Sequence, residues 1–297
     1  LFNIIGVAIM APLIPRLVPL LERVIPTREL AVSVPHFLND AALAFPDTAL
    51  KAIVRESGHL LGNAFDFIAR GLGLPAAELR ERRPLAQVMH QVPDLDTAAL
   101  DDLYQRRIKG LFSAIFAYST RAEPALLPEQ LAQLLDIRRA LRDVVTAIKD
   151  IKHLHKNLRR YANGRNPDMR VQYAAAQTLV ARVLQANSLI LQDREEALAA
   201  LAAAEQEIAV YDIVEDCTLD CLIRENRITP EMATSLINDS GYARHIAQKL
   251  AEAGKTLLQE QTYELLLTIQ AEDGAVAADA TEKADPTEKT DPTEKAA

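Results

Sequence analysis

The chain has 297 residues, of which 49% are hydrophobic, and a formal net charge of -8. This length is enough for one large domain or two small ones, and the apolar content is ample for a buried core. Residues 272–297 hold eight acids and three lysines, so they contribute -5 of the net charge and leave -3 for the rest. Such a balance excludes the broad positive field typical of nucleic-acid binders, and we expect no nucleic-acid partner.

Composition predicts an all-α protein. Glycine is sparse, tryptophan is absent and the apolar residues are mainly Leu and Ala, which is typical of helical bundles rather than sheets. The only two cysteines, Cys217 and Cys221, are four residues apart in a helical pattern. We interpret them as reduced packing residues on one helix face in a cytosolic setting.

Residues 1–25 are predicted to be the C-terminal part of a transmembrane segment. From Leu1 to Pro15 the only polar side chain is Asn3, and no residue is charged. A complete membrane helix needs about 20 apolar residues, so the run is either the end of a span that starts upstream or an interfacial segment. The missing basic n-region disfavours a signal peptide, and the nearly continuous apolarity disfavours a buried amphipathic helix.

Residues 26–46 contain several prolines and are predicted to form a linker, and residues 47–270 to form a helical domain. Apolar residues at three- and four-residue steps predict a first helix capped by Asp47 and a second that begins at Asp96. A third, about 35 residues long, is expected from Pro128 to Asn163.

A fourth helix is expected from Asp168, and a fifth, alanine-rich helix continues as far as Leu222; a break between them near Asp193 is left open. The last helix, capped by Thr229, is expected to run toward Leu267. Helices of this length, each with one apolar stripe, can bury those stripes only against one another, which predicts an antiparallel bundle. Residues 271–297 repeat Thr-Glu-Lys with Asp-Pro and are predicted to be a disordered charged tail.

Three stretches of the sequence form recognisable motifs. They are Leu1-Phe2-Asn3-Ile4-Ile5-Gly6-Val7; Pro35-His36-Phe37-Leu38-Asn39 with Phe45-Pro46-Asp47-Thr48-Ala49-Leu50 and Ile53-Val54-Arg55-Glu56; and Thr234-Ser235-Leu236-Ile237-Asn238-Asp239-Ser240-Gly241-Tyr242. In this order they resemble the bacterial Na/Pi cotransporter family, whose membrane part is followed by a PhoU-like domain. The first is similar to the end of the family's membrane part, the second to the junction with its PhoU-like domain, and the third to a motif late in that domain.

The resemblance implies a C-terminal fragment of a sodium-dependent phosphate cotransporter, with a PhoU-like helical bundle that regulates transport. It implies a bacterial plasma (inner) membrane protein whose bundle is cytoplasmic and whose partner is an upstream membrane domain. The Gln-Ser-Ser turns of the family's transport site do not occur in this sequence. Sodium and phosphate are therefore expected as ligands of the full-length transporter, and no cofactor or substrate site is expected in this chain. The alternative is a soluble PhoU-like phosphate-signalling adaptor, and the oligomeric state, a homo-oligomer included, is left open.

Two groups of residues are candidate sites. The first is a basic stretch that either contacts an anionic surface, such as lipid headgroups, or forms an ordinary solvated helix face; its members are Lys149, Lys152, Lys156, Arg159 and Arg160. The second, at helical spacing, is Asn238, Asp239 and Tyr242, which we interpret as a regulatory or structural polar cluster.

No metal site or catalytic site is expected. PhoU proteins often place acidic pairs on facing helices, but the corresponding stretch, Asp150 to Lys156, carries lysines where acids are needed, and His153 and His155 are expected at the surface. The acids beside the two cysteines, Glu215, Asp216 and Asp220, lack a second cluster to complete a metal shell. The sequence contains no nucleophile paired with a base and no glycine-rich phosphate loop, so we expect no enzyme activity.

Overall fold

The computed structural model describes residues 34–89 and 96–284, with side chains as far as Ala275. Over these residues the chain is helical and contains no strand, which confirms the all-α class. The predicted membrane segment, residues 1–25, lies outside the described residues, as does the end of the predicted tail from residue 285. Within the described ranges, no helix combines the length and the apolarity needed to cross a bilayer.

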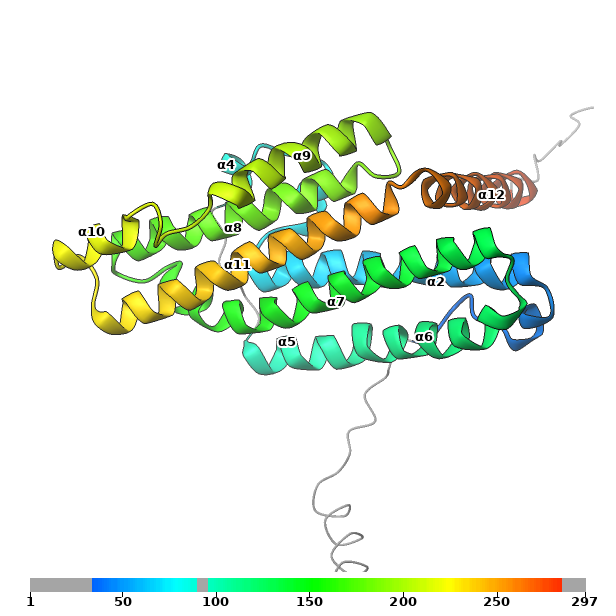
Figure 1. Cartoon of the computed structure of the whole chain (residues 1–297), viewed down its shortest axis with the longest axis horizontal. Helices are drawn as coiled ribbons and strands as arrows, with labels where there is room; N and C mark the ends of the chain where they lie inside the picture. Colours follow the sequence, from blue (N-terminus) through cyan, green and yellow to red (C-terminus); the bar gives the residue numbers. More distant parts are fainter. Residues whose placement is uncertain (1–33, 90–95, 285–297) are drawn as a thin grey trace, which may run out of the picture. The chain divides into compact units, whose positions relative to one another are not determined.

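Long helical segments account for most of the described chain (Figure 1). They are α2 (Pro46–Leu72), α5 and α6 (Thr97–Tyr104 and Gly110–Ala122, joined without a break by a π-helical turn at Gln105–Lys109), α7 (Pro128–Tyr161), α8 (Pro167–Ser188), α9 (Arg194–Val210), α11 (Pro230–Leu257) and α12 (Glu260–Ala284). The shorter elements are η1 (Asp40–Ala44), α3 (Ala76–Arg80), α4 (Leu85–Val88), η3 (Glu123–Ala125) and α10 (Thr218–Arg224).

Proline at the first helical position opens α2, α7, α8 and α11, because its fixed φ suits a helix start and its missing N–H would have no helical partner there. Asp47 was predicted to cap the first helix and does not: the cap position is Phe45, and Asp47 lies in the first turn. The fourth helix is capped by Asn166, whose Oδ1 accepts the backbone N–H groups of Asp168 and Met169.

Successive long helices from α2 to α11 run in opposite directions, if the continuous segment of α5 and α6 is counted as one helix. Helices α7 and α11 are antiparallel, since Asp150 faces His245 near one end of their contact and Asp143 faces Lys249 further along. Helices α2 and α7 are parallel, because the Gly71 carbonyl oxygen lies 2.8 Å from Nδ1 of His155 and the side chain of Gln130 bonds that of Asp47 at the other end. The result is the bundle of alternating helices that the apolar stripes predict.

Small residues allow α7 and α11 to pack closely at the centre of the bundle (Figure 1). Ala140 and Ala147 on α7 and Ala243 and Ala247 on α11 are all fully buried. Leu, Ile and Val side chains from α2, α8 and α9 surround this contact and complete one continuous apolar core. The long helices therefore share one core rather than forming separate domains.

Helix ends in the second half of the chain differ from the prediction. A break does separate α8 from α9, and Asp193 caps α9. The predicted last helix ends at Leu257 instead of running on toward Leu267, and Arg194 donates two hydrogen bonds to the Leu258 carbonyl, which gives the end of α11 a partner. Helix α12 then continues to Ala284, past Ala271 where the sequence predicts order to end.

Candidate functional site

The segment that precedes α2 is bonded to the bundle through a buried carboxylate. Glu56 has no solvent-exposed surface, and its Oε2 accepts the backbone N–H of Phe37 at 2.7 Å. Its Oε1 lies 2.9 Å from Nδ1 of His59, whose ring stacks on that of His36 with centroids 4.6 Å apart. One side chain of α2 therefore fixes the position of the chain that leads into the domain.

Helix α6 holds the same segment from the other side. The Asn39 side chain caps η1 by accepting the Ala41 N–H at 2.9 Å, and the Asn39 carbonyl accepts the Tyr118 hydroxyl at 2.8 Å. Arg121 pairs with Asp40 at 3.0 Å and lowers the pKa of that carboxyl. We refer to Phe37, Asn39, Glu56, His59 and Tyr118 together as the junction site.

A second polar group lies buried among α7, α8 and α11. The Asp239 carboxylate on α11 is 3% exposed and accepts hydrogen bonds from the hydroxyl of Tyr173 on α8 and from the side chain of Asn157 on α7. Burial raises the pKa of Asp239, and the two hydrogen bonds act in the opposite direction. Burial likewise raises the pKa of Tyr173, whose ring stacks on that of Tyr161 at 5.5 Å. The group bonds three helices to one another through a single carboxylate.

The other two members of the predicted polar cluster lie elsewhere on α11. Asn238 is exposed, and Tyr242 is half-buried with its ring stacked on His153 at 5.2 Å. Asn238 thus faces solvent, whereas Tyr242, like Asp239, contacts α7. Of the set, only Asp239 makes buried hydrogen bonds to α7 and α8.

The predicted basic stretch contains both paired and unpaired cations. Lys152 pairs with Asp101 at 2.6 Å and lies 4.8 Å from the Tyr104 ring centroid, and Arg160 pairs with Glu231 at 3.0 Å. The remaining three, which are exposed and have no ion-pair partner among the described residues, are Lys149, Lys156 and Arg159. The anionic-surface interpretation therefore depends on these three side chains.

Two expectations about which side chains are exposed are wrong. His155 is fully buried rather than at the surface, with Nδ1 2.8 Å from the Gly71 carbonyl. The thiols of Cys217 and Cys221 are free and exposed rather than packed: Cys217 precedes α10 with φ 61°, and Cys221 lies within α10 with its side chain exposed. In the ranges that the structure covers, no group of three or more His, Cys, Asp or Glu side chains is placed to hold a metal ion.

Glu56 lies in a stretch that resembles the family, but it was not among the predicted site residues. The sequence does contain a pattern that predicts its burial. Glu56 lies three residues after Ile53 and four before Leu60, so helical spacing places it on the buried stripe of α2. A charged residue on such a stripe needs partners.

A scan of known family models finds no match to this chain, and searches of curated proteins and of solved structures also find none.

Proposed function

We propose that this chain is the C-terminal regulatory part of a sodium-dependent phosphate cotransporter, and that its PhoU-like bundle acts on the upstream membrane domain through the junction site. The observation that carries the proposal is that three stretches resemble the family in the family's order. Within the stretch that resembles the membrane-to-domain junction, Pro35 to Glu56, the backbone N–H of Phe37, which precedes α2, bonds Oε2 of Glu56 in α2.

The physical basis of the coupling is the cost of breaking hydrogen bonds to a buried side chain. Glu56 is a fully buried carboxylate, and a displacement of α2 that separated it from Phe37 would leave a charge without one of its donors. Such a displacement is costly, so the segment before α2 moves together with the helix. A change of packing in the bundle would thereby reach the chain that precedes it.

The proposal assigns sodium and phosphate to the full-length transporter and assigns neither a cofactor nor a catalytic role to this bundle. It places the protein in the bacterial inner membrane with the bundle in the cytoplasm. Lys149, Lys156 and Arg159 would then be free to meet anionic lipid headgroups, each gaining about 1 kcal/mol near the surface.

The test is uptake of labelled phosphate by cells that lack their own phosphate transporters and express the complete open reading frame containing this chain. We expect uptake that requires a sodium gradient, and a Glu56→Ala variant that is made at the same level but no longer adjusts uptake to phosphate supply. Glu264→Ala, which changes an exposed acid on α12, is the matched control. Absence of sodium-dependent uptake would overturn the proposal.

Carbonate extraction of membranes separates the transporter from a soluble PhoU-like adaptor. We expect the complete protein to stay with the membrane pellet, whereas release into the supernatant would favour the adaptor. Vesicles that contain only the 297-residue chain are expected not to accumulate phosphate, since the proposal assigns the transport site to another part of the protein.

A further inference from the structure

Helix α12 is attached to the rest of the bundle along a narrow stripe. Of its residues 260–275, whose side chains the structure describes, only Thr262 and Ile269 are buried. Near its start the Gln261 carbonyl accepts a hydrogen bond from Nε2 of Gln133 on α7 at 3.0 Å. A helix with so few buried side chains lies at the low end of local stability in a folded protein, so it can open while the rest of the bundle stays folded.

Ion pairs hold the far end of α12 to α2. Lys51 and Arg55 pair with Glu272, and Arg55 also pairs with Asp273. The four side chains are between 23% and 52% exposed, so water and salt reach these pairs. Pairs at such exposure are individually weak and are screened by salt. The contacts that hold this end of α12 can therefore be broken without disturbing the core.

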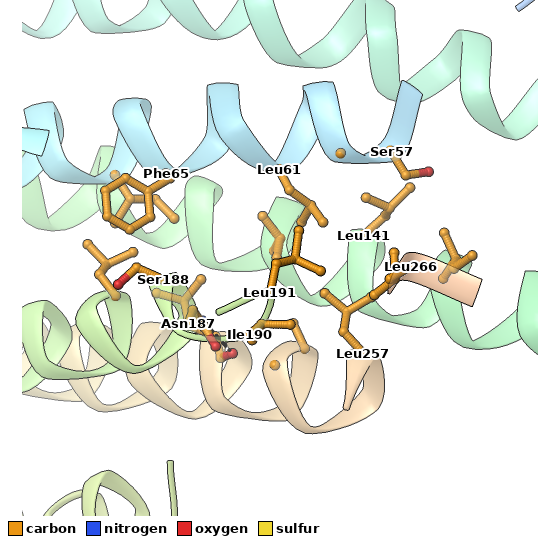
Figure 2. A pocket seen from close by; sticks show the side chains of 18 of the residues that line it. Ser57, Leu61, Phe65, Leu141, Asn187, Ser188, Ile190, Leu191, Leu257 and Leu266 are labelled. Atoms are coloured by element: carbon orange, nitrogen blue, oxygen red, sulfur yellow. Dashed lines mark hydrogen bonds between the residues drawn. The ribbon is translucent and has the colours of Figure 1, made fainter. Parts of the chain in front are cut away.

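Helix α12 also forms part of the wall of an apolar cavity (Figure 2). The cavity has a volume of about 250 Å³ and lies between α2, α7, α8 and α11, and no charged side chain is among the described residues that line it. Figure 2 shows Leu266 of α12 at the end of the cavity where Leu141 and Leu257 also lie, and Ser188 toward the other end. Departure of α12 would therefore expose apolar side chains at one end of the cavity.

We propose that α12 is a releasable strap, which covers one end of this cavity while its ion pairs are made and opens that end to solvent when they break. Leu266 and Ile269 favour the closed state, because exposing them to water costs free energy. The end of α11 stays in place, since Arg194 bonds the Leu258 carbonyl there. The strap is a property of the bundle itself and does not depend on the proposed transport function.

Two serines that line the cavity supply matched reporters of its opening. Both hydroxyls, of Ser57 and Ser188, donate at 2.7 Å to carbonyls of their own helices, so cysteine is an equally mild replacement at either site. Ser57, which is 3% exposed, lies toward the α12 end in Figure 2, and Ser188 lies toward the other end. Each is changed to cysteine in the complete chain carrying Cys217→Ser and Cys221→Ser, which removes both exposed native thiols.

The measurement is the rate of thiol modification by N-ethylmaleimide, with and without the double substitution Lys51→Gln and Arg55→Gln. We expect the rate at Ser57→Cys to rise about fivefold or more when the ion pairs are removed, and the rate at Ser188→Cys to change by less than about twofold. No change at Ser57→Cys would overturn the proposal. Equal acceleration at both sites would also overturn it, because it would indicate loosening of the whole bundle.

Salt supplies a second test that leaves α2 unchanged. Sodium chloride at about 0.5 M screens exposed pairs, so it should accelerate modification at Ser57→Cys while Lys51 and Arg55 are present and have little effect once both are Gln. A salt effect of the same size in both proteins would show that these pairs do not hold the strap, and the proposal would fail.

Discussion

A fully buried carboxylate is costly unless its oxygens have partners, and Glu56 has one on each: the Phe37 N–H at 2.7 Å and Nδ1 of His59 at 2.9 Å. We expect Glu56→Ala to lower the free energy of unfolding by about 1–3 kcal/mol, because it leaves the partly buried Phe37 N–H without its acceptor. Glu56→Gln keeps one acceptor and should lose less. Urea unfolding measures the first effect, and faster exchange of the Phe37 amide locates it. An Ala variant as stable as wild type would show that the hydrogen bonds of Glu56 contribute nothing to the free energy of unfolding.

At Asp239 the pH dependence of stability can be assigned to one side chain. Burial raises its pKa, so the folded protein binds this proton more tightly than the unfolded chain, whose value is near 3.8. The stability that this proton contributes is complete below that value and is lost as the pH rises through the folded-state pKa.

Asp239→Asn removes the titration and keeps an oxygen that can accept the Tyr173 hydroxyl. We therefore expect the unfolding free energy of the variant minus that of wild type to increase as the pH rises from about 4 to about 7. Asp212, whose pKa is lowered, titrates in both proteins and cancels in this difference. A difference that stays constant over this range would show that the pKa of Asp239 is not raised.

At the scale of the element, two glycines of α11 are expected to respond in opposite ways. A Cβ on Gly254 would clash with Oδ1 of Asn187 and lie 3.1 Å from Leu201, whereas a Cβ on Gly241 has no atom within 4 Å. Gly254→Ala should lower the free energy of unfolding by about 1–3 kcal/mol, since α8 and α9 must shift. Gly241→Ala should raise it by up to about 1 kcal/mol through helix propensity. Equal effects in thermal or urea unfolding would contradict this packing.

Helix α12 is held to the start of α2 by ion pairs. Lys51 and Arg55 pair with Glu272, and Arg55 also pairs with Asp273 at 2.8 Å. Exposed pairs of this kind are individually weak, so Arg55→Gln should increase amide exchange in α12 severalfold without changing α7 or α11. Arg159→Gln, at an exposed position with no described ion pair, is the control. Unchanged exchange in α12 would show that the Arg55 pairs do not hold it.

The beginnings of the helices were easier to predict from sequence than their ends. Proline at Pro128 and Pro230 marks the start of α7 and α11, and each fixes one backbone angle locally. At the end of α11 the Leu258 carbonyl is bonded by Arg194, more than sixty residues earlier in the chain. The continuation of α12 past Ala271 likewise coincides with ion pairs to α2. The partners, Arg194 and the cations of α2, are distant in sequence from these helix ends. The local sequence pattern therefore predicted neither the end of α11 nor the continuation of α12.

At the scale of the whole molecule, the same limit applies to the candidate sites. Periodicity places Asp239 on α11 but does not show that Tyr173 and Asn157 meet it, because that depends on how three helices are rotated about their axes. For the same reason the sequence groups Asn238 with Asp239, although the Asn238 side chain is exposed. It also does not indicate the cavity beside Asn187, which arises where α2, α7, α8 and α11 fail to fill the space between them.

The proposed position at a membrane makes a prediction for the basic stretch. Lys152 and Arg160 are already paired with carboxylates. We therefore expect Lys149, Lys156 and Arg159 to contact anionic lipid. We expect a variant with Gln at these three positions to bind vesicles of phosphatidylcholine and phosphatidylglycerol at least tenfold more weakly, since each cation contributes about 1 kcal/mol near an anionic surface.

The control for this experiment is a double variant with Gln at Lys152 and Arg160, whose cations are held by Asp101 and Glu231. It should bind nearly as tightly as wild type in a sedimentation assay, and binding by all three proteins should weaken as salt is added because the attraction is screened. If the triple variant binds like wild type, the stretch is an ordinary solvated helix face. The bundle would then have to meet the membrane domain through the junction site alone.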